Sequence, residues 1–167
     1  MRIIVVAAIF FGAALIGGGC PSQQPVPSGE INFVGQSPIA PGIYTGTRNC
    51  HDIVNGSSDD SSDSISFTID NDGLLVLNGA AIHIGLVNTF ATGAFTQSST
   101  IKSITVTNDG FTIEWNTTWT VNGAKITGFT SETYKSLGPN TFEFDSSLYG
   151  SSSLYAFQES CSATVSR

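Results

Sequence analysis

The chain has 167 residues, of which 6 are Lys or Arg and 13 are Asp or Glu, so its formal net charge is −7. This balance excludes nucleic acid as a partner, because such binding depends on basic side chains that neutralise phosphates. It also excludes charge-driven adsorption to an anionic membrane surface. The length is that of one domain, and it suffices to bury a core without a stabilising metal.

Residues 1–20 have the pattern of an export signal. Arg2 supplies one positive charge, Ile3–Ile16 is an apolar run of 14 residues, and three glycines lead to Cys20. A charged start, a short apolar stretch and small residues at its end are typical of a secretory signal peptide. The run is shorter than the roughly 20 residues of a membrane-spanning helix, which is the alternative interpretation.

The end of this segment resembles a bacterial lipoprotein signal, with Gly18-Gly19-Cys20 behind Leu15-Ile16. The resemblance implies a lipid on Cys20, which would tether an extracytoplasmic protein to a membrane of the bacterial cell envelope. Gly17 stands where that family usually has an aliphatic residue. Small residues at 17 and 19 also suit ordinary signal peptidase, and cleavage by that enzyme would give a freely secreted protein.

The three cysteines have separate predicted uses. Once Cys20 carries lipid, Cys50 and Cys161 remain as a pair, and an oxidising compartment predicts a disulfide between them. The bridge would close a loop of about 110 residues and contribute about 4–5 kcal/mol in the chain-entropy description. The alternative is a reactive thiol at Cys50, activated by the neighbouring His51.

Residues 21–41 are rich in Pro, Ser and Gln and are interpreted as a linker. Within this linker, residues 31–34 (Ile-Asn-Phe-Val) are apolar enough to dock on the domain as a short edge strand. The folded domain is therefore predicted to span residues 42–167.

Strand-forming runs and turn residues alternate along this domain. The runs lie near residues 42–49, 65–69, 74–77, 80–87, 103–107, 111–121, 124–131, 142–144 and 155–165. The clearest run places six apolar or β-branched residues of 111–121 on one face, and Asn122-Gly123 after it is a strong hairpin signal. The serine- and aspartate-rich residues 56–64 are expected to form a solvated, mobile loop.

The pattern predicts an all-β domain of seven to nine antiparallel strands, either an up-and-down barrel or a two-sheet sandwich. A bridge between the first and last strands favours the closed barrel. Gly42-Ile43-Tyr44, the chain length and the closing bridge resemble the calycin group, which includes lipocalins and avidins. That resemblance implies a cup-shaped barrel holding small apolar ligands, and it assigns no binding residue.

Two tryptophans are the main candidates for a ligand site. Trp115 and Trp119 lie on the same face of one predicted strand, about 13 Å apart at 3.3 Å per residue. With Tyr44 they are candidate binding residues for a small apolar or sugar ligand. The alternative is ordinary core packing, since aromatic residues dominate β cores.

Other chemistry is not indicated. The acidic segment lacks the spacing of a calcium loop, the two histidines are far apart, and no G-x-S-x-G motif is present. No catalytic residue, cofactor or metal ligand is therefore predicted. The sequence favours a lipid-anchored extracytoplasmic binding module, with a structural envelope protein that contacts other proteins as the alternative and a secreted hydrolase as the weaker third.

Overall fold

The computed structural model describes residues 39–77, 79–153 and 155–167, and these residues form ten β-strands and no helix. Within that part of the chain, nothing helical is long and apolar enough to cross a membrane. The strands are β1 (Gly42–Val54), β2 (Ser57–Ile69), β3 (Leu75–Leu77), β4 (Ala80–Ala81), β5 (Val87–Thr92), β6 (Phe95–Thr107), β7 (Gly110–Val121), β8 (Ala124–Gly138), β9 (Thr141–Ser151) and β10 (Ala156–Ser166).

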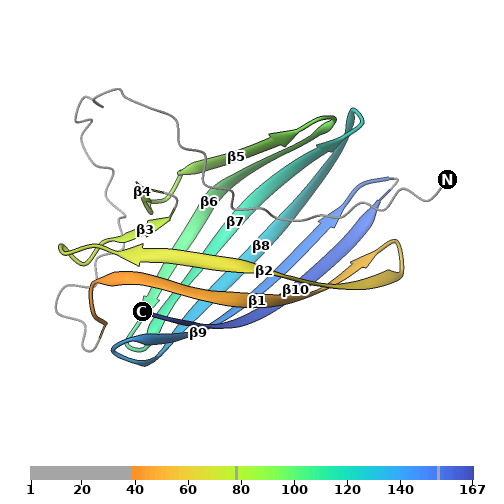
Figure 1. Cartoon of the computed structure of the whole chain (residues 1–167). Helices are drawn as coiled ribbons and strands as arrows, with labels where there is room; N and C mark the ends of the chain where they lie inside the picture. Colours follow the sequence, from red (N-terminus) through yellow and green to blue (C-terminus); the bar gives the residue numbers. More distant parts are fainter. Residues whose placement is uncertain (1–38, 78, 154) are drawn as a thin grey trace.

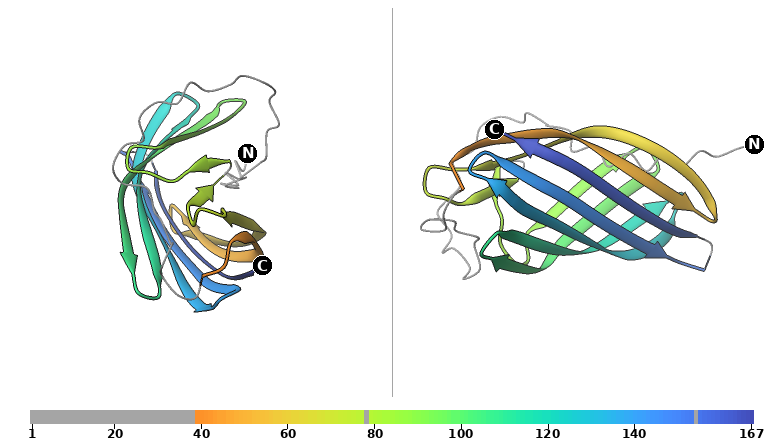
Figure 2. Two further views of the ribbon diagram at one scale, coloured as in Figure 1. Left: turned by 90° about the vertical axis from the view of Figure 1, so that its left-hand side faces the viewer. Right: turned by 90° about the horizontal axis from the view of Figure 1, so that it is seen from below.

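All ten strands belong to one antiparallel sheet in the order β4-β3-β2-β1-β10-β9-β8-β7-β6-β5. The sheet curls into an open half-barrel (Figures 1 and 2). The predicted all-β, antiparallel class is confirmed. The expected count of seven to nine strands was too low, because the predicted run at 80–87 holds only the two-residue strand β4, and a further strand, β5, follows it at Val87–Thr92. One curled sheet takes the place of the sandwich alternative.

The closed barrel that the sequence favoured is not formed, because no strand ladder closes the curl among the described residues. Its edge strands are β4 and β5, and β2 pairs with β3 only through Thr68 and Ile69. The connection from β4 to β5 spans the gap instead, since the Ile82 amide donates to the Leu75 carbonyl and the Gly85 amide to the Ile101 carbonyl. Most of the outer edge of β2 consequently has no strand partner among the described residues.

The structure corrects the prediction for the segment after Cys50. β1 continues past Cys50 to Val54, and Asn55 and Gly56 turn the chain with φ values of 49° and 83°. The serine- and aspartate-rich residues that were predicted to form a loop are the first half of β2, which pairs with β1 along all its 13 residues. Ladder hydrogen bonds thus override the weak strand propensity of Ser and Asp. The predicted edge strand at 31–34 lies outside the described residues.

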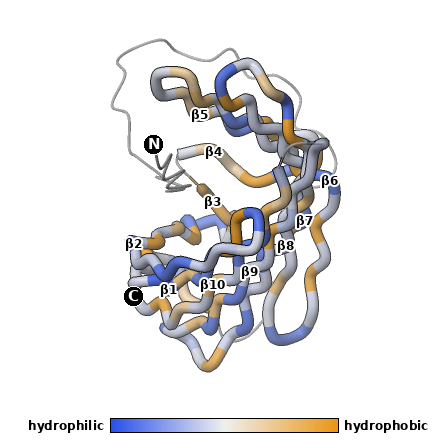
Figure 3. The backbone as a smooth tube through the Cα atoms, turned by 90° about the vertical axis from the view of Figure 1, so that its right-hand side faces the viewer, coloured by the Kyte–Doolittle hydropathy of each residue, from blue (hydrophilic) through white to orange (hydrophobic). Residues whose placement is uncertain are grey.

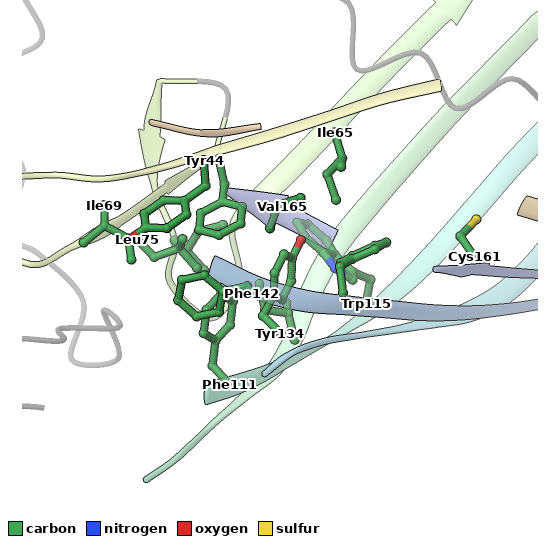
Figure 4. Packing of buried hydrophobic residues seen from close by; sticks show 14 of the residues in the cluster. Tyr44, Ile65, Ile69, Leu75, Phe111, Trp115, Tyr134, Phe142, Cys161 and Val165 are labelled. Carbon is green, nitrogen blue, oxygen red and sulfur yellow. The ribbon is translucent and has the colours of Figure 1, made fainter. Parts of the chain in front are cut away.

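One end of the curl, which we call the proximal end, contains Gly42 and Arg167 and is filled by aromatic rings. Tyr44 stacks on Phe67 at 5.0 Å between ring centroids, and Phe111 stacks on Tyr134 at 4.4 Å. Figure 4 shows Tyr44, Phe111, Tyr134 and Phe142 close together between the strands. Hydrophobic and polar residues alternate along most of the strands (Figure 3), which places the buried residues of a strand on one face, the concave one.

The opposite, distal end is where β1 meets β2, β7 meets β8 and β9 meets β10. Here a second cluster of buried residues forms around Trp119, Ile126 and Leu148. The rings of Trp119 and Phe157 meet edge to face with centroids 4.6 Å apart. They lie close over the backbone at Gly128 and Gly150, which are opposite each other in the β8–β9 ladder.

Replacing Gly128 with alanine is expected to lower the free energy of unfolding by about 1–3 kcal/mol, the usual cost of overpacking. The new Cβ atom would lie 2.2 Å from the Tyr149 carbonyl oxygen and 2.6 Å from the Trp119 ring. Urea unfolding followed by tryptophan fluorescence measures the change. Thr127→Ala, on the exposed face of the same strand, is the control and should change stability by less than about 0.5 kcal/mol. Equal stability of the two variants would show that Trp119 moves at little cost.

Candidate functional site

A layer of charged side chains crosses the concave face between the two apolar clusters. Arg48 on β1, Glu132 on β8 and Glu159 on β10 are only 4%, 7% and 7% exposed. Burial of charge costs free energy unless the charges are paired. Ionisable groups held at such a cost are candidates for a functional site.

Arg48 is fixed by a carboxylate on the neighbouring strand. Its Nε and Nη2 atoms donate to the two carboxylate oxygens of Asp63 at 2.5 and 2.7 Å. Burial alone would lower the pKa of Arg48, but the bond to Asp63 and the charges of Asp63, Glu159 and Glu132 raise that pKa above its ordinary value. Arg48 therefore stays charged inside the sheet.

Glu132 accepts hydrogen bonds from two aromatic side chains. Trp115 Nε1 donates to it at 3.1 Å and the Tyr134 hydroxyl at 3.4 Å. Burial raises the pKa of Glu132, although the bond from Trp115 and the charge of Arg48 oppose the rise. The pKa of Tyr134 is raised well above its ordinary value by burial and by the Glu132 charge, so its hydroxyl keeps its proton.

Glu159 and Asp52 form a pair of carboxyl groups directly opposite each other on β10 and β1. Burial, then the charge of Asp52, raises the pKa of Glu159 from 4.5 to about 8, with Arg48 opposing. The Oδ1 atom of Asp52 is buried and has no hydrogen-bond partner. The layer thus joins one guanidinium to four carboxyl groups, those of Asp52, Asp63, Glu132 and Glu159.

The Glu159 pKa predicts that the protein becomes less stable as pH rises. Between about pH 4.5 and 8 the folded state holds a proton on Glu159 that the unfolded state has lost. The free energy of unfolding should therefore fall by about 1–3 kcal/mol from pH 5 to pH 9. Urea titrations across this range measure the slope, and Glu159→Gln should flatten it. The exposed Glu143→Gln on β9 is the control and should keep the wild-type slope. A wild-type slope in the Glu159→Gln variant would contradict the assignment.

Two small cavities adjoin the charged layer. The polar one has a volume of about 30 Å³, and the apolar one, nearer the distal end, about 40 Å³. The polar cavity is lined by Arg48, Asn88, Gln97, Ser99, Trp115, Thr130, Glu132, Ser146, Leu148 and Glu159. The apolar cavity is lined by Val54, Phe95, Trp119, Val121, Ile126, Tyr155 and Phe157.

The cavities are neighbours along the concave face. Gln97 lines the polar cavity and accepts a hydrogen bond at 3.2 Å from Trp119 Nε1, whose ring lines the apolar one. Leu148, in the wall of the polar cavity, packs in the same cluster as Trp119 and Ile126. The polar and the apolar cavity are therefore neighbours on the concave face, with the Gln97–Trp119 hydrogen bond between them.

The predicted site residues have different places in this arrangement. Trp115 lines the polar cavity and Trp119 the apolar one. Tyr44 is fully buried in the proximal core, where its hydroxyl donates to the carbonyls of Ala40 (2.7 Å) and Pro139 (3.0 Å). The structure therefore brings the two tryptophans to the cavities and leaves Tyr44 in the packed end.

Cys50 and Cys161 form the predicted disulfide. The two cysteines are opposite each other in the β1–β10 ladder. The Asp52–Glu159 pair lies two residues further along both strands, on the same face of the sheet. With Glu159 the two cysteines make the one group of three close metal-ligating side chains found among the described residues. Because the two sulfur atoms are bonded to each other, this group offers no set of thiolate ligands.

Arg48, Glu132 and Glu159 were not predicted to share a site. A signal was present, since Arg48 is four positions from Tyr44 and Glu132 two positions from Tyr134, which places each charge on the inward face of its strand.

The convex face carries a separate polar arrangement. His51 Nδ1 lies 2.7 Å from Asp60 Oδ1, and Ser160 is opposite His51 on β10. These residues line a shallow depression of about 610 Å³. The pair is largely exposed, with side chains 52% and 85% accessible, and sequence analysis had not connected His51 with Asp60.

No family model, curated protein or solved structure matches this chain. The geometry of the concave face is therefore the feature that bears on function.

Proposed function

We propose that this chain is an extracytoplasmic β domain that binds a small molecule inside its curled sheet. The observation that carries the proposal is the buried charged layer beside an apolar cavity on the same concave face. For the stability of the fold alone, hydrophobic residues would be favoured at the positions of the charged layer, because replacing buried ion pairs with hydrophobic residues is often stabilising. Retention of these charges is accounted for by a ligand that uses them.

The setting of the protein is part of the proposal. A disulfide indicates an oxidising, extracytoplasmic compartment. We propose further that a lipid on Cys20 holds the domain at a membrane of the bacterial envelope, as the N-terminal sequence predicts, with free secretion as the alternative. Intact mass of the chain from its native host should correspond to a start at Cys20 plus a diacylglyceryl and an acyl group. An unmodified mass would favour secretion.

Binding is favoured over catalysis by the two places where catalytic groups gather. The His51–Asp60 pair with Ser160 lies on flat sheet whose backbone amides bond to neighbouring strands. Amides engaged in a ladder cannot stabilise an oxyanion. On the concave face, Glu132 and Glu159 line only the polar cavity, whose volume of about 30 Å³ does not hold a substrate together with an attacking water molecule. We therefore propose no catalytic residue.

The test uses the chain's own tryptophans. Both of its tryptophans line the cavities, so an occupant should change their fluorescence. Native mass spectrometry of chain purified from its host should show a bound small molecule, and adding it back to stripped protein should shift the emission. The proposal would be refuted if no adduct were found and if no compound in a panel of small amphipathic molecules changed the fluorescence.

A structural envelope protein is the second candidate, and the sheet edges favour it. Most of the outer edge of β2 and the free edge of β5 have no strand partner among the described residues. Such edges can pair with a strand of another protein. Crosslinking in intact cells from residues of β2 should then give discrete products, whereas only monomer would count against this candidate.

A further inference from the structure

We propose that the convex face of the sheet is a second binding site, which takes a neutral oligosaccharide. The site lies around His51 and Ser160, on the side of the sheet opposite the charged layer and its two small cavities. This inference goes beyond the ligand proposed for the concave face and is independent of it.

Two shallow depressions on the convex face share part of their lining. The larger, of about 610 Å³, has His51, Asp60 and Ser160 in its wall. The smaller, of about 300 Å³, is lined by His51 and Ser160 as well, and also by Phe129 and Tyr149. Because both depressions contain His51 and Ser160, they adjoin at these two residues. Both volumes lie in the range of roughly 300–1,000 Å³ that is usual for ligand sites.

Strand register arranges this surface in rows across neighbouring strands, which lie side by side in Figure 2. In the first row, which we call the aromatic row, Phe129 on β8 is opposite Tyr149 on β9. The row continues through Gln158 on β10 to Ile53 on β1. Four adjacent strands at a spacing of about 4.8 Å make the aromatic row about 14 Å long.

Two polar rows run beside the aromatic row. Two residues along each strand, or about 6.6 Å away, His51 lies between Asp60 and Ser160, and Ser160 is opposite Ser147. His51 Nδ1 lies 2.7 Å from Asp60 Oδ1, a contact that orients the imidazole ring. The row beyond this one is also polar and consists of Ser62, Asn49, Ser162 and Asp145.

A pyranose ring matches an aromatic row with polar rows beside it. One face of the sugar ring presents C–H groups, which pack against the electron-rich face of an aromatic ring. Tyr149 is 52% exposed and can offer such a face. The hydroxyl groups at the edge of the sugar both donate and accept hydrogen bonds. The serine hydroxyls and the Asn49 amide do the same, and the carboxylates of Asp60 and Asp145 accept.

The charge of this face favours a neutral oligosaccharide over an anionic one. The polar rows contain the carboxylates of Asp60 and Asp145, and the chain as a whole has a net charge of −7. The Lys102 ammonium group lies 5.4 Å from the centroid of the Phe129 ring, and it is also 3.9 Å from the Glu114 carboxylate, which offsets its charge. Sugars that carry carboxylate, sulfate or phosphate groups would therefore be repelled.

The decisive experiment titrates the full chain at pH 7 with four neutral hexasaccharides: maltohexaose, cellohexaose, mannohexaose and chitohexaose. Isothermal titration calorimetry should show one-to-one binding of at least one of them, with a Kd below about 1 mM. The anionic hexamer of galacturonic acid should not bind. No binding of any neutral hexasaccharide at millimolar concentration would overturn the proposal, and so would equally tight binding of the galacturonic acid hexamer.

Variants at exposed positions locate the site, and they should fold as the wild type does. Tyr149→Ala should weaken binding about tenfold, because it removes the exposed ring of the aromatic row. Ser160→Leu should abolish binding, because it puts a bulky side chain on a residue that both depressions share. Ile43→Ala is the matched control, since Ile43 is 61% exposed on the same strand as His51 but eight residues away. Wild-type affinity in Tyr149→Ala, or equal weakening in Ile43→Ala, would overturn the site.

Tryptophan fluorescence distinguishes the convex site from the concave one. Trp115 and Trp119 line the concave cavities, so a saccharide on the opposite face should leave their emission unchanged. A saccharide that shifts this emission would overturn the convex site while supporting the proposed function. If a second copy of the chain covers the convex face instead, no hexasaccharide should bind, and Tyr149→Ala should convert a dimer into a monomer in sedimentation. That result would also overturn the saccharide assignment.

Discussion

Replacing both Cys50 and Cys161 with alanine is expected to lower the free energy of unfolding by about 4 kcal/mol. The bridge joins residues separated by 111 positions, so it removes a large amount of conformational entropy from the unfolded chain. Alanine is the suitable replacement because both cysteines are buried, and serine would add a buried hydroxyl group. Urea unfolding of the wild type and the double variant measures the difference.

Reduction and a third cysteine provide the controls. A thiol reductant should destabilise the wild type by a similar amount and leave the double alanine variant unchanged. Cys20→Ser keeps both bridge cysteines and should unfold as the wild type does. A reduced wild type with an unchanged midpoint would show that the β1–β10 ladder holds without the bridge.

Replacing Arg48 with methionine is expected to cost about 3–5 kcal/mol at pH 8. Methionine fills part of the space of the Arg48 side chain but removes the positive charge of its guanidinium from the layer. Asp63 then loses the two charge-assisted hydrogen bonds that Arg48 donates. Glu132 loses the charge that opposes the rise of its pKa. The loss should be smaller at pH 5, where Glu159 is protonated in the folded protein and its neutral carboxyl group does not need the charge of Arg48.

A compensating variant separates charge from packing. Adding Glu159→Gln to Arg48→Met should recover part of the stability at pH 8, because one buried negative charge disappears. Lys135→Met, at an exposed position of β8, is the control for loss of a surface cation and should change little. If Arg48→Met unfolds as the wild type does, the buried layer contributes nothing to stability.

Regular alternation made the strands of this domain predictable. Phe111, Ile113 and Trp115 are buried on the concave face of β7 as their spacing indicated. Asn122 and Gly123 turn the chain with positive φ values of 50° and 82°, as expected for a two-residue hairpin. These signals are local, so one stretch of sequence contains them completely.

Features that depend on distant partners were not predictable in the same way. β2 begins at Ser57 because the backbone of β1 pairs with it from that residue onward. Nothing within the serine- and aspartate-rich segment itself indicates that it will pair with β1. The charged layer likewise forms from β1 and β2 together with β8 and β10, which are far apart in the sequence and come together only in the folded sheet. The tryptophan pair was predictable as a candidate because both residues lie on one strand, whereas Glu132 and Glu159 needed the three-dimensional arrangement.

The edges of the sheet lie in the middle of the sequence, while the two ends of the domain meet inside the sheet, where Arg167 Nη1 donates to the Pro41 carbonyl at 2.5 Å. The fold is therefore a circular permutation of a plain meander that would run from β5 through β10 and β1 to β4. In that permuted order every strand would pair with its sequence neighbour, the contact order would fall and folding should accelerate. The bridge would then close a loop of roughly 15 residues and contribute about 3 kcal/mol. The natural chain order, by separating β1 from β10, is what gives the disulfide its greater effect on stability.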